Sequence, residues 1–350
     1  MRRFHGACLI LIGLVALSPL SCRDDGNSSC PVCPGAPPAE PTLENIWPNA
    51  DSTAWTYTIA QRQWSDSTSP QVYPSAEEVP PAPTIDEIRG SLWAGQVSER
   101  VHTVRGTYRL QFLGRMTTES GAEGQLLKET VYSENRENPK SRFTGLTASF
   151  YRHLARARPD LKARLLAKGL IDSENDGRLS RSPDLADTLN QIEPAYFYLH
   201  GHAWERTAEQ IGGYGDLDTV PSWKFLERDL SPGHEFVQQL VPELADDVFL
   251  HARILPRRSV ATEAGLFTNC VECAYLIDYG IATAVSENGQ ELGSYRVYDF
   301  ASIIYAPGYG PVASYQRTPP LAPAMVAGDL GYALDFRISL IGTNVRSRNP

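Results

Sequence analysis

The chain has 350 residues, of which 42% are hydrophobic and 21% are charged, and its formal net charge is −9. This composition is ordinary for a globular protein, and the length is enough to bury a sizeable core. The negative charge argues against nucleic acid and against anionic lipid surfaces as partners, because both repel an acidic protein.

The first 21 residues have the pattern of a secretory signal. A basic start is followed by the apolar run Ala7–Leu17, which is too short to cross a bilayer as a helix. Ser21 then precedes Cys22, and this arrangement resembles a bacterial lipoprotein signal, with Pro19 where Leu, Val or Ile is usual. The resemblance implies that Cys22 becomes the diacylated N-terminus. The alternative is an ordinary cleaved signal with a chance cysteine.

Residues 22–44 predict a flexible tether. From Arg23 to Pro41 the chain is mostly Gly, Ser, Asp, Asn, Pro and Ala, which cannot bury enough surface to offset the entropy of ordering. About twenty such residues reach on the order of 25 Å on average. We therefore expect an exported, lipid-anchored protein on the cell membrane or outer membrane, facing the periplasm or the exterior.

Two C-x-x-C pairs follow the leader, Cys30 with Cys33 and Cys270 with Cys273. Disulfides suit an oxidising exported compartment, buried or free thiols are a second possibility, and a four-thiolate zinc site is a third. Cys270 and Cys273 lie in a predicted strand, where residues three apart are too distant to bond to each other. The four cysteines are thus disulfide candidates whose pairing stays open.

An N-terminal β region is predicted for residues 45–138. A strand begins at Ala54, and Ser69–Thr84 is a proline-rich segment that indicates a surface loop. Two further strands form an antiparallel pair that turns at Ser120–Gly124.

A helical insertion is predicted for residues 139–194. Leu146–Leu170 has helical spacing, and Pro159 separates two helices within it. Ser182–Ile192 begins like a third helix, with Ser at the cap and Pro in the first turn.

A C-terminal β region is predicted for residues 195–350, with a type I′ hairpin turn at Asn288-Gly289. Its strands are expected in Ala195–Ile211, Ser222–Leu230, Asp246–Thr262, Leu266–Ser286, Gln290–Ala306, Gly310–Arg317 and Leu330–Gly342. The whole pattern predicts a mostly β (α+β) fold: a curved antiparallel sheet, partial barrel or sandwich, with a helical insertion.

Two stretches carry a family resemblance. Glu263–Tyr275 (EAGLFTNCVECAY) and Ile303–Gln316 (IIYAPGYGPVASYQ) resemble bacterial cell-envelope lipoproteins of unknown function, which have a PAGtF-x-x-C strand and a late yApGvGpV turn. The resemblance implies the fold and the exported address, and a carrier or scaffold role, but it carries over no catalytic residue. Gly265, Gly308 and Gly310 are expected to allow sharp turns.

A possible calcium site lies in Asp172–Asp184 (DSENDGRLSRSPD). Acidic residues at alternate positions and a following glycine match the start of an EF-hand-type loop, although Pro183 replaces the usual bidentate Glu. Ca²⁺ is the only cofactor this pattern suggests, and a solvated acidic turn is the alternative. The expected ligands are Asp172, Glu174, Asp176, Ser180 and Asp184.

His200 and His202 form an H-x-H pair on one side of a predicted strand. Such a pair can hold zinc if a third ligand arrives from elsewhere, for example His234, Glu235 or His251, but most such pairs are half-exposed strand histidines. The sequence contains no nucleophile, phosphate-loop or dinucleotide motif.

The sequence predicts a membrane-tethered exported lipoprotein whose domain is a non-catalytic binding or structural module of the cell envelope. Its expected partners are the membrane, reached through the lipid anchor, and an envelope ligand or protein that the sequence does not identify. The alternative is a secreted metal-dependent or acid–base hydrolase that uses the helical insertion as a lid. No catalytic residue is assigned for either reading.

Overall fold

The computed structural model describes residues 40–48, 52–65, 70–91, 102–117, 123–133, 150–171, 198–206, 210–214, 223–286, 288–319 and 332–345. All of them belong to one structural unit, Ala36–Pro350. Within the described part of the chain, no helix is long and apolar enough to cross a membrane.

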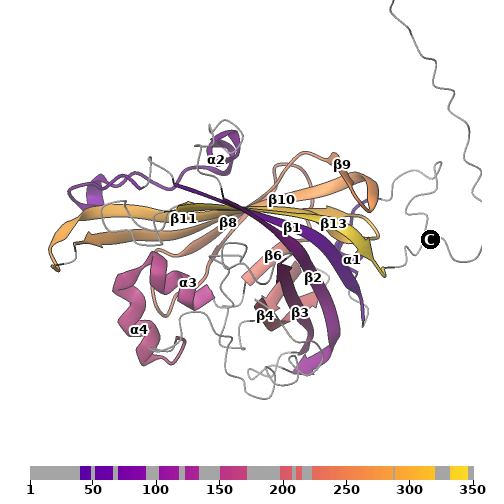
Figure 1. The fold of residues 1–350 in the computed structure, drawn as a ribbon, viewed down its shortest axis with the longest axis horizontal. Helices are drawn as coiled ribbons and strands as arrows, with labels where there is room; N and C mark the ends of the chain where they lie inside the picture. Colours follow the sequence, from indigo (N-terminus) through magenta and orange to yellow (C-terminus); the bar gives the residue numbers. More distant parts are fainter. Residues whose placement is uncertain are drawn as a thin grey trace, which may run out of the picture. The chain divides into compact units, whose positions relative to one another are not determined.

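Within the described residues, thirteen strands form one antiparallel sheet. Figure 1 draws these strands as arrows. They are β1 (Ala54–Ser65), β2 (His102–Thr117), β3 (Glu123–Ser133), β4 (Tyr198–Arg206), β5 (Gln210–Tyr214), β6 (Trp223–Glu227), β7 (Glu235–Gln239), β8 (Phe249–Ile254), β9 (Arg258–Thr262), β10 (Gly265–Val285), β11 (Glu291–Ala306), β12 (Gly310–Thr318) and β13 (Tyr332–Thr343). Their order is β6-β5-β4-β3-β2-β1-β13-β12-β11-β10-β8-β7, and β9 pairs with β10. The predicted fold class, a curved antiparallel sheet with a helical insertion, is confirmed.

Short helices accompany the sheet. They are α1 (Leu43–Ile46), α2 (Ile85–Ser91), α3 (Phe150–Ala157) and α4 (Lys162–Ala167), with the 3₁₀ turns η1 (Ala76–Glu78) and η3 (Pro159–Leu161). Pro159 opens η3 between α3 and α4, where the sequence predicts a break between two helices.

β10 and β11 form a long hairpin in the described sheet. Its strands have 21 and 16 residues and pair from Val271 with Tyr305 to Val285 with Glu291. Most of β10 between Cys270 and Ala284 is buried, on both of its faces. A hairpin turn follows, but it is not the predicted type I′ turn centred on Asn288-Gly289. The Gly289 N–H donates to the Ser286 carbonyl oxygen at 2.9 Å, so the turn starts one residue earlier, and Gly289 closes it with a positive φ of 83°.

The inner face of this sheet packs against α3 and α4. Leu154 of α3 and Leu165 of α4 are fully buried in the same cluster as Tyr279 and Val297 of the hairpin. Burial of their apolar sides against the sheet stabilises helices too short to persist alone. α3 and α4 therefore cover the inner face, and Figure 1 shows them on the other side of the sheet from α2.

The outer face carries a second, smaller core. Ile85 and Ile88 of α2 pack against Leu276 and Phe300, which alternate along the strands with the inward-facing residues. The segment before α2 also contacts the sheet, since Tyr73 forms a backbone bridge to Ser294. The prediction of a plain surface loop over Ser69–Thr84 was therefore incomplete: the described part, from residue 70, leads into a helix that buries two isoleucines.

The turn between β11 and β12 has the backbone that its glycines predict. Gly308 and Gly310 have φ of 82° and 88°. The Gly308 N–H donates to the Asn45 carbonyl oxygen at 2.7 Å, and a Cβ at Gly310 would lie 3.0 Å from the Trp55 ring. The turn is thus fixed against α1 and β1, which explains the glycine at its end.

The two end strands of the sheet, β6 and β7, approach each other without forming a ladder. The Lys224 N–H of β6 donates to Oε1 of Gln238 of β7 at 2.7 Å. The Tyr275 hydroxyl of β10 donates to the Phe225 carbonyl oxygen at 2.8 Å. These side-chain contacts hold β6 against the inner face, while the sheet stays open along this line.

Candidate functional site

A buried polar cluster joins η3 to the inner face of the β10–β11 hairpin. Its centre is Arg158, which is 7% exposed and directly precedes η3. Its guanidinium donates two hydrogen bonds to Asp160, both of 2.9 Å, and one of 2.8 Å to Oδ2 of Asp247. A further bond of 2.8 Å reaches the Tyr279 carbonyl oxygen. Arg158 thus links the helical layer, the β7–β8 loop and β10.

The pKa of Arg158 reflects these contacts. Burial alone lowers it, but the hydrogen bonds and negative charges of Asp160 and Asp247 outweigh burial and raise it. The guanidinium is therefore a permanent cation within its two carboxylates. These contacts of Arg158 are structural, because its guanidinium donates its hydrogen bonds to other groups of the chain.

The Arg158–Asp247 pair requires glycine at position 280. Gly280 has φ of 81° and follows a bulge in the pairing of β10 with β11. A Cβ there would overlap the Asp247 carboxylate and lie 2.8 Å from Nη1 of Arg158. The backbone approaches the ion pair more closely than any other residue would allow.

A second buried group lies beside this cluster. The Tyr279 hydroxyl donates to Oδ2 of Asp299 at 2.9 Å, and Nε2 of His153, on α3, lies 2.8 Å from the same oxygen without making a hydrogen bond to it. Asp299 is 5% exposed, and its Oδ1 has no hydrogen-bond partner among the described residues. Burial, together with the Asp299 charge, raises the pKa of Tyr279 well above its usual value.

The 2.8 Å contact between His153 and Asp299 ties α3 to β11. An Asp–His pair is also the orienting half of many acid–base sites. In this chain the contact between His153 and Asp299 lies inside the helix–sheet interface, where His153 is mostly buried.

The outer face has its own buried carboxylates. Oε2 of Glu272 lies 2.9 Å from Nη1 of Arg258 and 3.5 Å from Nη2 of Arg89 on α2, while its Oε1 accepts from Ser302 at 2.6 Å. Asp278 pairs with Arg296; burial raises its pKa, and the Gly280 N–H and Arg296 oppose that effect only in part. These pairs fasten α2 and neighbouring strands together.

A surface cluster surrounds His234, at the entrance to β7. Its Nε2 lies 2.7 Å from Oε2 of Glu227, and its Nδ1 lies 3.5 Å from Oδ2 of Asp229. Burial raises the pKa of Glu227, but Lys224 and His234 lower it by a larger amount. Hydrogen bonds from Ser231 lower the pKa of Asp229. The cluster joins the end of β6 to the start of β7.

The two cysteines of β10 are buried and are not bonded to each other. Cys270 pairs with Arg258 of β9, whereas Cys273 pairs with Ile254 of β8. Burial raises the pKa of Cys270 to about 11 and that of Cys273 to about 12. Both thiols therefore stay protonated and poorly nucleophilic. Cys30 and Cys33 lie outside the described residues, so whether these four disulfide candidates pair, and in what way, stays open.

The remaining predicted site residues stay untested. Cys22 and the calcium segment from Asp172 to Asp184 lie outside the described residues. His200 and His202 lie in β4, as predicted, with backbone pairing to Glu129 and Leu127 of β3. In the part of the chain that the structure describes, no three His, Cys, Asp or Glu side chains gather in a way that could hold a metal ion.

Sequence reasoning missed the polar cluster altogether. Arg158 and Asp247 are 89 positions apart, and nothing in a spacing pattern links them. One signal was present: Glu272, Asp278 and Asp299 interrupt otherwise apolar strands. Carboxylates at such positions need partners, so they indicate buried ion pairs before the partners are known.

Comparison with known proteins gives distant likeness only. No family model and no curated protein matches the chain. It is similar to the crystal structure of a protein classed as exported, with a YmcC-like fold, from Bacteroides fragilis NCTC 9343. The TM-score is 0.30 and the identity 10%, over 85% of this chain and 98% of that one. A protein classed as a lipoprotein, from Parabacteroides distasonis ATCC 8503, gives a TM-score of 0.32 and 8% identity over the same shares.

Proposed function

We propose that this chain is an exported lipoprotein, anchored through Cys22, whose β domain is a non-catalytic binding or structural module of the cell envelope. The observation that carries the proposal is the position of Cys22. It follows a basic start and the apolar run Ala7–Leu17, with only Ser18–Ser21 between, and it directly precedes a segment with almost no large apolar residue. An acylated cysteine at this point would leave a tether between the membrane and the domain.

The chemistry inside the domain supports a structural role. Arg158, Glu272 and Asp278 are buried charges, and each is bound by an opposite charge from another part of the chain. Buried pairs of this kind fix how elements sit together and contribute little net stability. Charges that neutralise one another in this way are unavailable to a substrate, which favours a scaffold or binding module.

Metabolic labelling tests the anchor. The full chain is expressed in a bacterial host fed with radiolabelled palmitate, beside the variants Cys22→Ala and Cys8→Ala. We expect label on the parent chain and on Cys8→Ala, and none on Cys22→Ala, because only the cysteine at the predicted cleavage point is acylated. Membrane fractionation should show the same pattern.

Two results would contradict the proposal. One is the absence of label from the parent chain, which would leave the ordinary cleaved signal. The other is label that survives Cys22→Ala, which would place the acyl chain elsewhere. Mass spectrometry of the mature N-terminus distinguishes these cases, because a lipoprotein begins at residue 22.

A further inference from the structure

The negative net charge of the chain hides a basic region. The segment 150–171, which holds α3, η3 and α4, contains four arginines and two lysines against a single acidic residue, Asp160. The whole chain has a net charge of −9. The helical layer is therefore strongly positive within an acidic protein.

α4 presents part of this charge to solvent. Its apolar side is buried, with Leu165 fully enclosed and Leu161 just before it in the same core. Lys162, Arg164 and Lys168 are exposed on and directly after the helix. Arg158, by contrast, forms ion pairs with Asp160 and Asp247. Within the described residues neither lysine makes an ion pair, so their charge is available to a partner.

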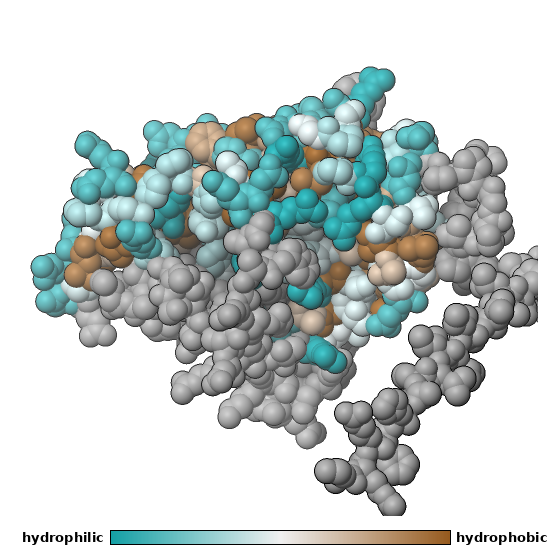
Figure 2. All heavy atoms as spheres, turned by 90° about the horizontal axis from the view of Figure 1, so that it is seen from above, coloured by the Kyte–Doolittle hydropathy of each residue, from teal (hydrophilic) through white to brown (hydrophobic). Residues whose placement is uncertain are grey.

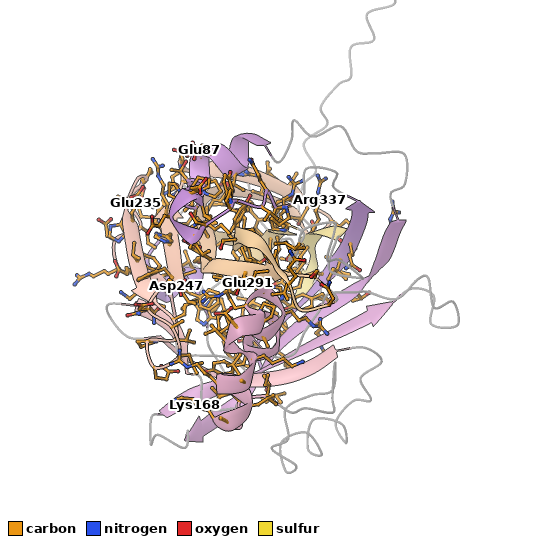
Figure 3. All side chains as sticks on the ribbon, turned by 90° about the vertical axis from the view of Figure 1, so that its left-hand side faces the viewer. Glu87, Lys168, Glu235, Asp247, Glu291 and Arg337 are labelled. Carbon is orange, nitrogen blue, oxygen red and sulfur yellow. The ribbon has the colours of Figure 1, made fainter. Side chains whose placement is uncertain are left out.

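On the opposite face, the segment 70–91 is acidic, with four carboxylates against one arginine. The segment over the outer face contains exposed Glu77, Glu78 and Glu87, and only Asp86 there pairs with an arginine, Arg253. Figure 3 shows Glu87 and Lys168 on opposite sides of the sheet, as α2 and α4 are in Figure 1. The segments 150–171 and 70–91 thus carry net charges of opposite sign on opposite sides of the sheet.

We infer that the exposed basic side of α4, defined by Lys162, Arg164 and Lys168, docks on an anionic phospholipid surface. Charge complementarity supports this partner, since each basic residue near an anionic leaflet attracts it. The acidic segment 70–91 on the outer face would at the same time be repelled, so the two segments together select one orientation. The net charge of the chain argues against an anionic lipid partner, but it sums the charges of both segments and so hides the basic one.

The choice of a membrane over other polyanions rests on the proposed function. If Cys22 is acylated, the described domain starts 18 residues further on, at Glu40. That length spans at most about 60 Å when fully extended. The tether would hold α4 near a lipid surface at high effective concentration, so that even weak attraction is sufficient to orient the domain.

Vesicle sedimentation tests the surface apart from the anchor. The chain from residue 22 onward is prepared with Cys22→Ser, which carries no acyl chain whether or not the native cysteine is lipidated. Binding is compared on phosphatidylcholine vesicles and on vesicles that also contain phosphatidylglycerol. The acidic segment that follows α4 in sequence is present in this chain, so its influence is included.

We expect binding to the anionic vesicles that weakens with salt. Lys162→Gln with Lys168→Gln should weaken it by on the order of twentyfold, since each basic residue contributes roughly a factor of five. The matched control, Arg105→Gln with Arg337→Gln, makes the same charge change at exposed strand positions and should leave binding nearly unchanged.

Three outcomes would overturn the inference: no binding to anionic vesicles, equal binding to both vesicle types, or equal loss in the two double variants. None of them bears on acylation, which the palmitate experiment measures separately. Circular dichroism of all variants checks that the helices remain folded, and the lysine sites are exposed enough for the substitutions to be tolerated.

Discussion

Gly280 lies directly against the ion pair of Asp247 and Arg158, at a backbone φ of 81° that other residues rarely adopt. A glycine at this position meets two requirements. It allows the bulge in β10, and it leaves room for the buried guanidinium of Arg158. Figure 2 shows one face of the molecule, on which polar residues are mixed with apolar patches. The contact of Gly280 with the ion pair lies inside, where it fixes the layers.

Gly280→Ala should be strongly destabilising. The new methyl group overlaps the Asp247 carboxylate and must also accept a positive φ, so we expect a loss of about 2–4 kcal/mol in the free energy of unfolding. Urea titration followed by tryptophan fluorescence measures it. Gly289→Ala is the matched control, because its φ is 83° and nothing lies within 4 Å of the new Cβ. A loss no larger than that of the control would contradict the close approach described here.

Arg158→Met tests the ion-pair cluster. Removing the guanidinium leaves Asp247 and the Tyr279 carbonyl without their shared donor, and we expect a loss of about 2 kcal/mol. This loss is below the roughly 3–5 kcal/mol that is usual for breaking a buried pair, because Asp160 and Asp247 are partly exposed and regain water. A double-mutant cycle with Asp247→Asn should show coupling between the two positions; additive losses would mean that the pair does not act as a unit.

How far the sequence predicts this structure depends on whether the signal is local. The place of the hairpin turn near Asn288-Gly289 and the glycine turn around Gly308 were predicted correctly, because turn residues act through their own backbone, whereas the type I′ geometry of the first was wrong. The break at Pro159 is of the same kind. The alternation of apolar residues likewise predicts the strands and the fold class.

The candidate site could not be predicted in this way. His153 and Asp299 meet only because α3 packs across the β10–β11 hairpin, and that crossing depends on the whole sheet. α2 was missed because prolines precede it, although Ile85 and Ile88 have helical spacing. Net charge also misleads, since it sums over faces that the fold separates.

The cluster around His234 predicts how acid affects stability. The pKa values of Glu227 and Asp229 lie below their ordinary values of 4.5 and 3.8 in the folded chain. Both carboxylates therefore stabilise the fold fully above those ordinary values, and this contribution is lost as the pH falls through the lowered ones. Glu227→Gln should flatten the fall in urea midpoint in this pH range, whereas Glu291→Gln, at an exposed site, should not. Identical acid profiles in the two variants would be evidence against the cluster.

The thiols of β10 should be unreactive until the chain unfolds. Burial, which raises the pKa of Cys270 to about 11 and of Cys273 to about 12, leaves almost no thiolate at neutral pH. Iodoacetamide should leave the peptide Ser259–Arg296 unmodified in native protein and add two groups after denaturation without reductant. Modification that appears only after reduction would instead show a disulfide, and mapping its partner would decide among the pairings that the sequence leaves open.

Elemental analysis tests the two metal hypotheses that no described contact decides. The chain from residue 22 onward is purified without chelator, dialysed and measured by plasma mass spectrometry. About one calcium per chain, lost in Asp172→Ala with Asp176→Ala, is the result expected if oxygen ligands converge in that loop. Zinc lost in His200→Ala with His202→Ala would support the H-x-H site and revive the hydrolase hypothesis, because a histidine site with an open position can activate water. Each double variant is the control for the other, since neither should alter the metal held by the other site. A chain that holds no metal would contradict both sites. The proposal of a non-catalytic binding or structural module would then remain.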